Sequence, residues 1–244
     1  MIASTSRLHA VRGAGELCER IAPQLRPQIA AAHMAPADVD LASLLPAERA
    51  ALSGCTTWVQ HRAAGRVCAH NALAQLDGPR VALFNGPERD VLWPAGWTGS
   101  ITHCDGYAAA IVAREDAVSS LGLDAEPHLP LPDDVLPHIS SLSERRQLSA
   151  LTSHSPEVAW DRALFCAKEA TFKAWYPLTR RWLGFLDAEV EIAPSGAFHA
   201  RVRDALDDGP VAELRDFVGA VALTATNILL AVVIVDVRPH EGAN

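Results

Sequence analysis

The chain has 244 residues, of which 49% are hydrophobic and 20% are charged, and its net charge is −8. It is long enough for one large domain or two small ones with real cores, so a disordered or fibrous protein is excluded. No apolar run reaches the roughly 20 residues of a membrane-spanning helix, and the N-terminus lacks the apolar block of a secretion signal, so we expect a cytoplasmic protein without a membrane partner.

The charge is unevenly distributed along the chain. Residues 1–118 carry 10 basic and 11 acidic side chains, whereas residues 119–244 carry 11 and 18. Nucleic-acid binding is disfavoured, because it requires a basic stripe. The acidic second half can instead hold a divalent cation.

The cysteines argue against both a disulfide framework and a thiolate zinc site, because their number is odd and none forms a Cys-x-x-Cys pair. Scattered, reduced thiols fit the cytoplasm. The five are Cys18, Cys55, Cys68, Cys104 and Cys166.

Residues 1–53 read as helices and loops, including a short helix that begins after Leu45 with Pro46 at its start. Residues 57–76 have helical periodicity. Arg62 and Arg66 are four residues apart and share a face, so they either meet an anion together or form solvated surface.

A hairpin is predicted over residues 97–113, with a tight turn at Asp105-Gly106. Thr102 and His103 lie at the end of its first strand. A histidine in this position is either a hydrogen-bonded surface residue or a ligand-binding one.

The next strand ends in Asp124 and Glu126, which project from the same face because side chains alternate along a strand. Two like charges at that separation repel, and a divalent cation with oxygen ligands would remove the repulsion. An unpaired pair of surface carboxylates is the alternative.

Residues 140–151 are predicted to form a helix that opens without a capping box, and residues 160–176 form the helix around which the chain is organised. One face of the latter is apolar, and Arg162, Glu169 and Lys173 lie on another. The only two lysines of the chain, Lys168 and Lys173, are both here. A lysine suits phosphate contact, although Glu169 and Lys173 alone could be a solvated salt bridge.

Two further hairpins are predicted over residues 185–204 and 217–237, the second containing the buried strand 227–235. The layout predicts an α+β fold with two similar lobes. We divide the chain into an N-terminal lobe with its helical segment, residues 1–118, and a C-terminal lobe carrying the metal site, residues 119–244.

Three blocks then stand in register: residues 93–107 (WPAGWTGSITHCDGY), 122–127 (GLDAEP) and 160–178 (WDRALFCAKEATFKAWYPL). Together they resemble the 4′-phosphopantetheinyl transferase superfamily, in its broad-specificity type that activates siderophore, polyketide and nonribosomal peptide synthetases. The resemblance covers most of the chain from about residue 45.

The resemblance implies a pseudo-dimer of two α+β lobes with the cofactor cleft between them. It implies transfer of the phosphopantetheine arm of coenzyme A, the co-substrate, onto a serine of an acyl or peptidyl carrier protein. Adenosine 3′,5′-bisphosphate would be released, and we expect a monomer.

Residue by residue, the resemblance assigns Mg²⁺, with Mn²⁺ as the alternative, to Asp124, Glu126 and Glu169. Coenzyme contacts are assigned to the residues Arg66, Thr102, His103, Lys168 and Lys173, and we add Arg62 to the coenzyme-binding set. We hypothesise that Glu169 accepts the serine proton and that Lys173 stabilises the leaving 5′-phosphate.

The sequence departs from the family pattern at Trp58 and Val59, where a basic pair is usual, at His61 and at Asn85. Arg62 and Arg89 are the candidates to replace the missing charges. These departures keep open a catalytically impaired coenzyme A- or carrier-binding protein, and the acidic residues alone would also fit a metal-dependent phosphohydrolase.

Overall fold

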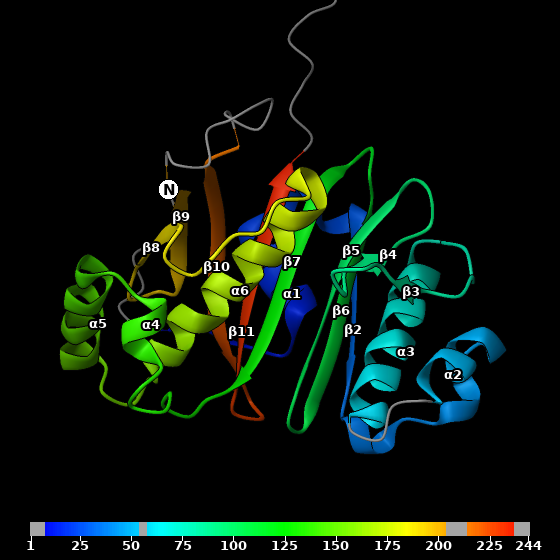
Figure 1. The fold of residues 1–244 in the computed structure, drawn as a ribbon, viewed down its shortest axis with the longest axis horizontal. Helices are drawn as coiled ribbons and strands as arrows, with labels where there is room; N and C mark the ends of the chain where they lie inside the picture. The colour runs from blue at the N-terminus through cyan, green and yellow to red at the C-terminus, as the bar shows by residue number, and fades with distance from the viewer. Residues whose placement is uncertain (1–7, 54–57, 204–213, 237–244) are drawn as a thin grey trace, which may run out of the picture.

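The computed structural model describes residues 8–53, 58–203 and 214–236, and it confirms the predicted α+β class. Two sheets stand side by side, and each is covered by one long helix (Figure 1). The helices are α1 (Ala14–Ile21), α2 (Pro46–Leu52), α3 (Val59–Gln75), α4 (Leu136–Ile139), α5 (Leu142–His154) and α6 (Trp160–Thr179), with short 3₁₀ turns at Pro23–Gln28, Pro36–Asp38 and Leu41–Ser43.

The larger sheet has the strand order β7-β11-β10-β9-β8, and β1 runs parallel to β10. The smaller sheet has the order β2-β6-β5, and a separate hairpin pairs β3 with β4. The larger sheet consists of β1 (Ala10–Val11), β7 (Val118–Pro127), β8 (Ala188–Ile192), β9 (Ala197–Val202), β10 (Asp216–Thr224) and β11 (Ile228–Asp236). The others are β2 (Ile29–Met34), β3 (Phe84–Asn85), β4 (Val91–Leu92), β5 (Trp97–Cys104) and β6 (Tyr107–Arg114).

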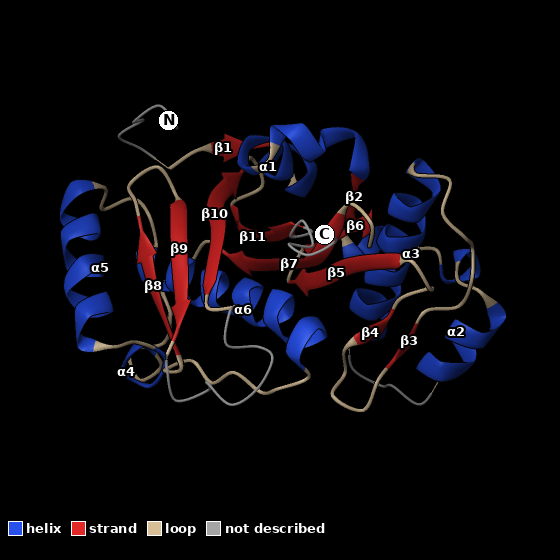
Figure 2. Ribbon diagram, turned by 90° about the horizontal axis from the view of Figure 1, so that it is seen from above, coloured by secondary structure: helices blue, strands red, loops and turns tan. Residues whose placement is uncertain are grey.

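Three apolar clusters hold these layers together. One lies between α6 and the larger sheet, and one lies between α3 and the smaller sheet. The third combines side chains of α1 with strands of both sheets. Figure 2 shows α1 on the side of the sheets opposite to α6, so that the N-terminal helix closes the back of the joint.

The two sheets meet where β5 runs beside β7. The two strands are not paired as in a sheet; side-chain hydroxyls of β5 bond backbone N–H groups of β7 instead. The Ser100 hydroxyl accepts the Leu123 N–H at 3.0 Å, and the Thr102 hydroxyl accepts the Ala125 N–H at 3.0 Å. Both hydroxyls are buried. They satisfy alternate N–H groups of β7 that would otherwise be buried without partners, which costs free energy.

Helix α6 lies directly on β7 because a glycine allows it. A Cβ atom added at Gly122 would collide with the Ala170 carbonyl oxygen of the helix. The close approach matters for the site, since Asp124 follows Gly122 on the strand and Glu169 precedes Ala170 on the helix.

Most predicted elements are confirmed: the helices near residues 46–52, 59–75, 142–154 and 160–179, and the three hairpins after residues 97, 188 and 216. The reading of residues 1–53 as helices and loops is wrong at β2, an alanine-rich strand that pairs with β6. Alanine has little strand propensity, so this strand depends on its distant partner.

The start of α5 is a second correction. Ser141 and Glu144 form a capping box, in which each side chain bonds the backbone N–H of the other residue. The signature Ser-x-x-Glu starts at Ser141, whereas the predicted helix starts one residue earlier, at Ser140.

The division at residues 118 and 119 stays a prediction, as does the similarity of the two lobes. β7 begins at Val118, close to that boundary. β1 does not follow this division: it lies within residues 1–118 but pairs with β10 in the larger sheet.

Candidate functional site

Two hollows flank the joint between the sheets. The wide hollow, about 1230 Å³, is lined among others by Trp58, Arg62, Arg66, His103, Glu126 and Arg162. The narrow hollow, about 510 Å³, is lined among others by Trp93, Ser100, Glu169, Phe172, Lys173 and Tyr176. Arg89, Val91 and Ile101 line both, so the hollows are adjacent and the β3–β4 hairpin lies between them.

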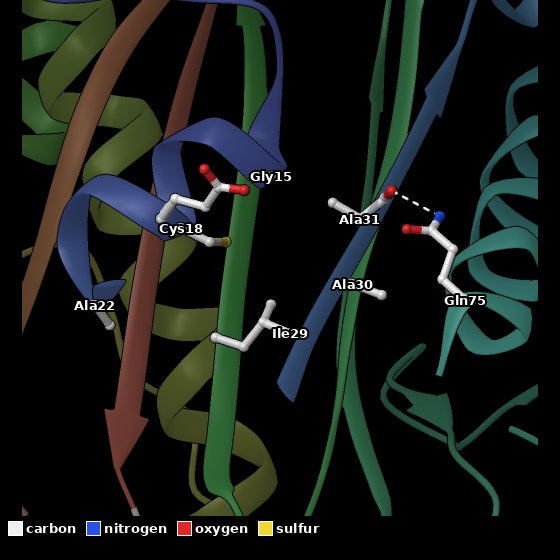
Figure 3. Close-up of a pocket in the computed structure, with 8 residues that line it drawn as sticks. Gly15, Cys18, Ala22, Ile29, Ala30, Ala31 and Gln75 are labelled. Atoms are coloured by element: carbon white, nitrogen blue, oxygen red, sulfur yellow. Dashed lines mark hydrogen bonds between the residues drawn. The ribbon is translucent and has the colours of Figure 1, made fainter. Parts of the chain in front are cut away.

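A smaller cavity of about 130 Å³ lies between α1, β2 and α3 (Figure 3). Gln75 closes one side by donating a hydrogen bond to the Ala31 carbonyl at 3.0 Å. Cys18 lies in its wall, and burial raises the pKa of this thiol to about 12, so it stays protonated and unreactive. None of the predicted site residues lines this cavity.

Asp124 lies at the centre of the polar cluster between the sheets. Its Oδ1 atom is 2.7 Å from Lys173 Nζ and accepts a hydrogen bond from the Thr102 hydroxyl at 3.3 Å. Lys173 Nζ also donates to the Leu123 carbonyl at 3.0 Å. Asp124 Oδ2 is buried and has no hydrogen-bond partner within the described ranges.

Glu126 of β7 is held by an ion pair with Arg162 of α6, the helix that also carries Lys173. Arg162 Nη1 lies 2.8 Å from Glu126 Oε2, and the same guanidinium donates to the Leu129 and Pro130 carbonyls. Burial and the charge of Asp124 raise the pKa of Glu126, and Arg162 opposes this shift. Arg162 therefore fixes both the carboxylate and the loop that follows β7.

Glu169 completes the acidic trio (Asp124, Glu126 and Glu169). Burial, and then the charge of Asp124, raise its pKa from 4.5 to about 7, while Lys173 lowers it and Glu126 raises it further. The carboxyl group of Glu169 therefore feels the charges of both strand carboxylates. A carboxyl whose pKa lies near neutrality can accept or donate a proton at physiological pH.

Lys173 stays charged in this environment. Burial alone would lower its pKa, but the charge and hydrogen bond of Asp124 raise the pKa above its ordinary value. Lys173 lines the narrow hollow, one helical turn beyond Glu169.

The trio has the donor chemistry that Mg²⁺ prefers, since all three residues offer carboxylate oxygens and Asp124 Oδ2 has no other partner. Within the part of the chain that is described, however, no three acidic, histidine or cysteine side chains converge as a ready-made metal site. Asp124 and Glu126 are each paired with a cation instead, Lys173 and Arg162 respectively. The three metal ligands thus remain a prediction, with an oxygen set that fits the ion.

The predicted basic residues of the wide hollow lie on its wall. His103 is near Arg62 and His61, and burial together with the positive charges of His61, Lys173 and Arg62 lowers its pKa, which favours the neutral ring. Arg66 donates from Nε to the Leu83 carbonyl at 3.0 Å and from Nη2 to the Asn85 side chain. Arg66 thus holds the β3–β4 hairpin as well as lining the hollow.

Two residues that the resemblance assigned to the coenzyme, Thr102 and Lys168, line neither hollow. Thr102 is 3% exposed, and its hydroxyl donates to Asp124 and accepts from the Ala125 N–H, so it positions Asp124. Lys168 is 4% exposed and lines neither hollow. Its ammonium group binds Glu144 and the carbonyls of Phe185 and Ala188, which ties α6 to α5 and β8.

Arg162 and the aromatic walls were not among the predicted site residues. A signal for Arg162 existed, because residues 162, 169 and 173 are separated by seven and four positions and share one face of a helix. Trp58, Trp93 and Phe172 had no such signal, since their convergence depends on the packing of distant elements.

Comparison with known proteins agrees with this architecture. Residues 60–113 match the 4′-phosphopantetheinyl transferase N-terminal domain, and residues 120–222 match the 4′-phosphopantetheinyl transferase superfamily. The two matches cover well over half of the chain; the first ends in β6 and the second begins in β7. The chain belongs to the 4′-phosphopantetheinyl transferase superfamily.

Three curated relatives are similar over part of their length. The 4′-phosphopantetheinyl transferase PptT of Mycobacterium tuberculosis is 51% identical over 125 residues, 51% of this chain and 54% of PptT. Svp of Streptomyces mobaraensis is 50% identical over 147 residues, 60% of this chain and 58% of Svp. Npt of Nocardia iowensis is 46% identical over 145 residues, 56% of this chain and 64% of Npt. The matched part of the chain thus spans between half and two thirds of each relative.

Among residues 8–53, 58–203 and 214–236, none of the helices combines the length and the apolar character needed to span a bilayer.

Proposed function

We propose that this protein transfers the 4′-phosphopantetheine arm of coenzyme A to a serine hydroxyl of an acyl or peptidyl carrier protein. The observation that carries the proposal is the arrangement of Asp124, Glu169 and Lys173: Glu169 and Lys173 of α6 line the narrow hollow, and Asp124 of β7 is bonded to Lys173 and acts on the charge of Glu169. The names of the relatives support the same reaction for those proteins.

The two hollows fit the two ends of coenzyme A. Arg62, Arg66 and Arg89 give the wide hollow a basic wall suited to the phosphates of the adenosine half. Trp93, Phe172 and Tyr176 give the narrow hollow an apolar wall suited to the pantetheine half. A coenzyme that spans both would bring its diphosphate to the acidic trio and Lys173.

The reaction joins the serine oxygen to the phosphorus that carries pantetheine. The bond from that phosphorus to the bridging oxygen breaks, and adenosine 3′,5′-bisphosphate leaves with the electron pair. Glu169 accepts the serine proton, directly or through a water molecule. Lys173, which stays protonated, stabilises the charge that develops on the leaving phosphate.

Mg²⁺ held by Asp124, Glu126 and Glu169 would neutralise diphosphate charge, which is the main electrostatic demand of phosphoryl transfer. In this chain Thr102 orients Asp124 and Arg162 orients Glu126. Protein side chains therefore fix the orientation of both carboxylates before any substrate binds.

The test is the mass of a purified carrier protein after incubation with this protein, coenzyme A and Mg²⁺. We expect a gain of one phosphopantetheine, and we expect Glu169→Gln to lower the rate at least about a hundredfold while remaining folded. Coenzyme A binding without any mass gain would instead identify an impaired binding protein. Nucleotide release in the absence of a carrier would identify a phosphohydrolase.

A further inference from the structure

Trp58 is held in a conformation that a bulky residue rarely adopts. It precedes the first turn of α3 with a φ of 65° and a ψ of 15°, in the left-handed region. For a residue with a side chain this conformation costs roughly 1–2 kcal/mol. Such strain persists where the surroundings impose it, and it is concentrated at ligand-binding sites.

The strained backbone presents an aromatic surface to the wide hollow. The indole is 57% exposed although it is the largest apolar side chain there. It lies nearly parallel to His103, with ring centroids 6.4 Å apart and an interplanar angle of 21°. His61 contacts the indole edge-on at 4.6 Å and His103 at 5.6 Å. We call Trp58, His61 and His103 the aromatic cluster.

The aromatic cluster stands next to fixed positive charges. Arg62, Arg66 and Arg89 line the same hollow. An open indole face beside guanidinium groups has two complementary halves: a flat surface for a heteroaromatic ring and donors for phosphate. A nucleotide combines both features in one molecule.

We propose that Trp58 is the base-stacking residue of this protein and that its indole carries the adenine ring of the coenzyme. The proposal rests on the function proposed above, which supplies the adenine nucleotide. It adds that recognition of the base depends on the indole of Trp58, the residue just before α3, while Arg62, Arg66 and Arg89 contact phosphate.

The test measures binding of adenosine 3′,5′-bisphosphate to the full chain by titration calorimetry. We expect Trp58→Ala to weaken binding about 5- to 100-fold, the loss typical of one base–aromatic stack. Trp58→Phe keeps an aromatic face and should stay within about threefold of the wild type. Inorganic pyrophosphate, which has no base, should bind all three proteins equally.

Trp58→Gly separates base stacking from a structural role. Glycine adopts the left-handed conformation without penalty, so this variant should keep or raise the melting temperature while losing nucleotide affinity as Trp58→Ala does. If Trp58 served only to anchor α3, the melting temperature would fall and nucleotide affinity would not change, and that result overturns the proposal.

The failures of the two proposals are distinguishable. Equal nucleotide affinity in the wild type and Trp58→Ala, together with normal transfer to a carrier, overturns the stacking role alone. If the wild type neither binds the bisphosphate nor modifies a carrier, both proposals are overturned.

Discussion

Lys173 Nζ lies 2.7 Å from Asp124 Oδ1, so this ion pair bonds helix α6 to strand β7. Asp124 is 5% exposed, and Lys173 is the cation bonded to its carboxylate. The pair therefore both charges the site and fixes the position of α6 on β7. Its loss has consequences for folding as well as for transfer.

Lys173→Met should destabilise the fold by about 2–3 kcal/mol, because removal of one partner leaves a buried carboxylate without its cation. Urea unfolding measures the effect. Adding Asp124→Asn to Lys173→Met removes the orphaned charge and should restore part of the stability. Equal stability of the single and double variants would contradict this account.

The stability of the metal-free protein should fall between acid and neutral pH because of Glu169. Its pKa is about 7 in the folded state against an ordinary value of 4.5, so the folded state binds the proton more tightly. The resulting stabilisation is present below about pH 4.5 and is lost as the pH rises through 7.

Glu169→Gln copies the protonated form and tests this pH dependence. In EDTA at pH 5 the variant and the wild type should melt nearly together. At pH 8 the variant should melt several degrees higher, at about 2–4 °C per kcal/mol for a chain of this size. A melting difference that does not change with pH would show that the charge of Glu169 is not penalised by burial.

The part of the fold that could be predicted from sequence is the part determined by local pattern. Helix α6 repeats apolar residues at helical spacing, and the Asp105-Gly106 turn indicates the β5–β6 hairpin. β2 could not be found this way, since an alanine-rich segment becomes a strand only through its pairing with β6.

The placement of the candidate site residues could be predicted to the same limited degree. Strand alternation places Asp124 and Glu126 on one face of β7, and helical spacing places Glu169 and Lys173 on one face of α6. Lys168 and Lys173 are five positions apart, which places their side chains about 140° apart on a helix. The spacing therefore predicts that the two ammonium groups face different surroundings, as the structure shows.

Lys168→Met should therefore destabilise the protein by about 3–5 kcal/mol, the usual cost of breaking a buried ion pair. At temperatures where the variant is folded, the KM for coenzyme A should not change, because Lys168 contacts α5 and β8 and lines neither hollow. Thermal unfolding and steady-state kinetics check the two statements. A KM increase of tenfold or more in the folded variant would show that Lys168 does contribute to coenzyme A binding.

Thr102 offers the sharpest test of how the joint between the sheets supports the site. Thr102→Val keeps the shape of the side chain but removes the hydroxyl that accepts the Ala125 N–H and donates to Asp124. We expect a loss of about 1–3 kcal/mol in unfolding free energy, because a buried N–H is left without a partner.

Thr102→Ser is the matched control, since it retains the hydroxyl and should recover most of the unfolding free energy. Carrier modification should separate the two variants in the same order, because the hydroxyl is one of the two groups, with Lys173, that bond Asp124 Oδ1. If valine and serine give the same transfer rate, the hydroxyl does not position Asp124. The connection between β5 and β7 would then serve stability alone.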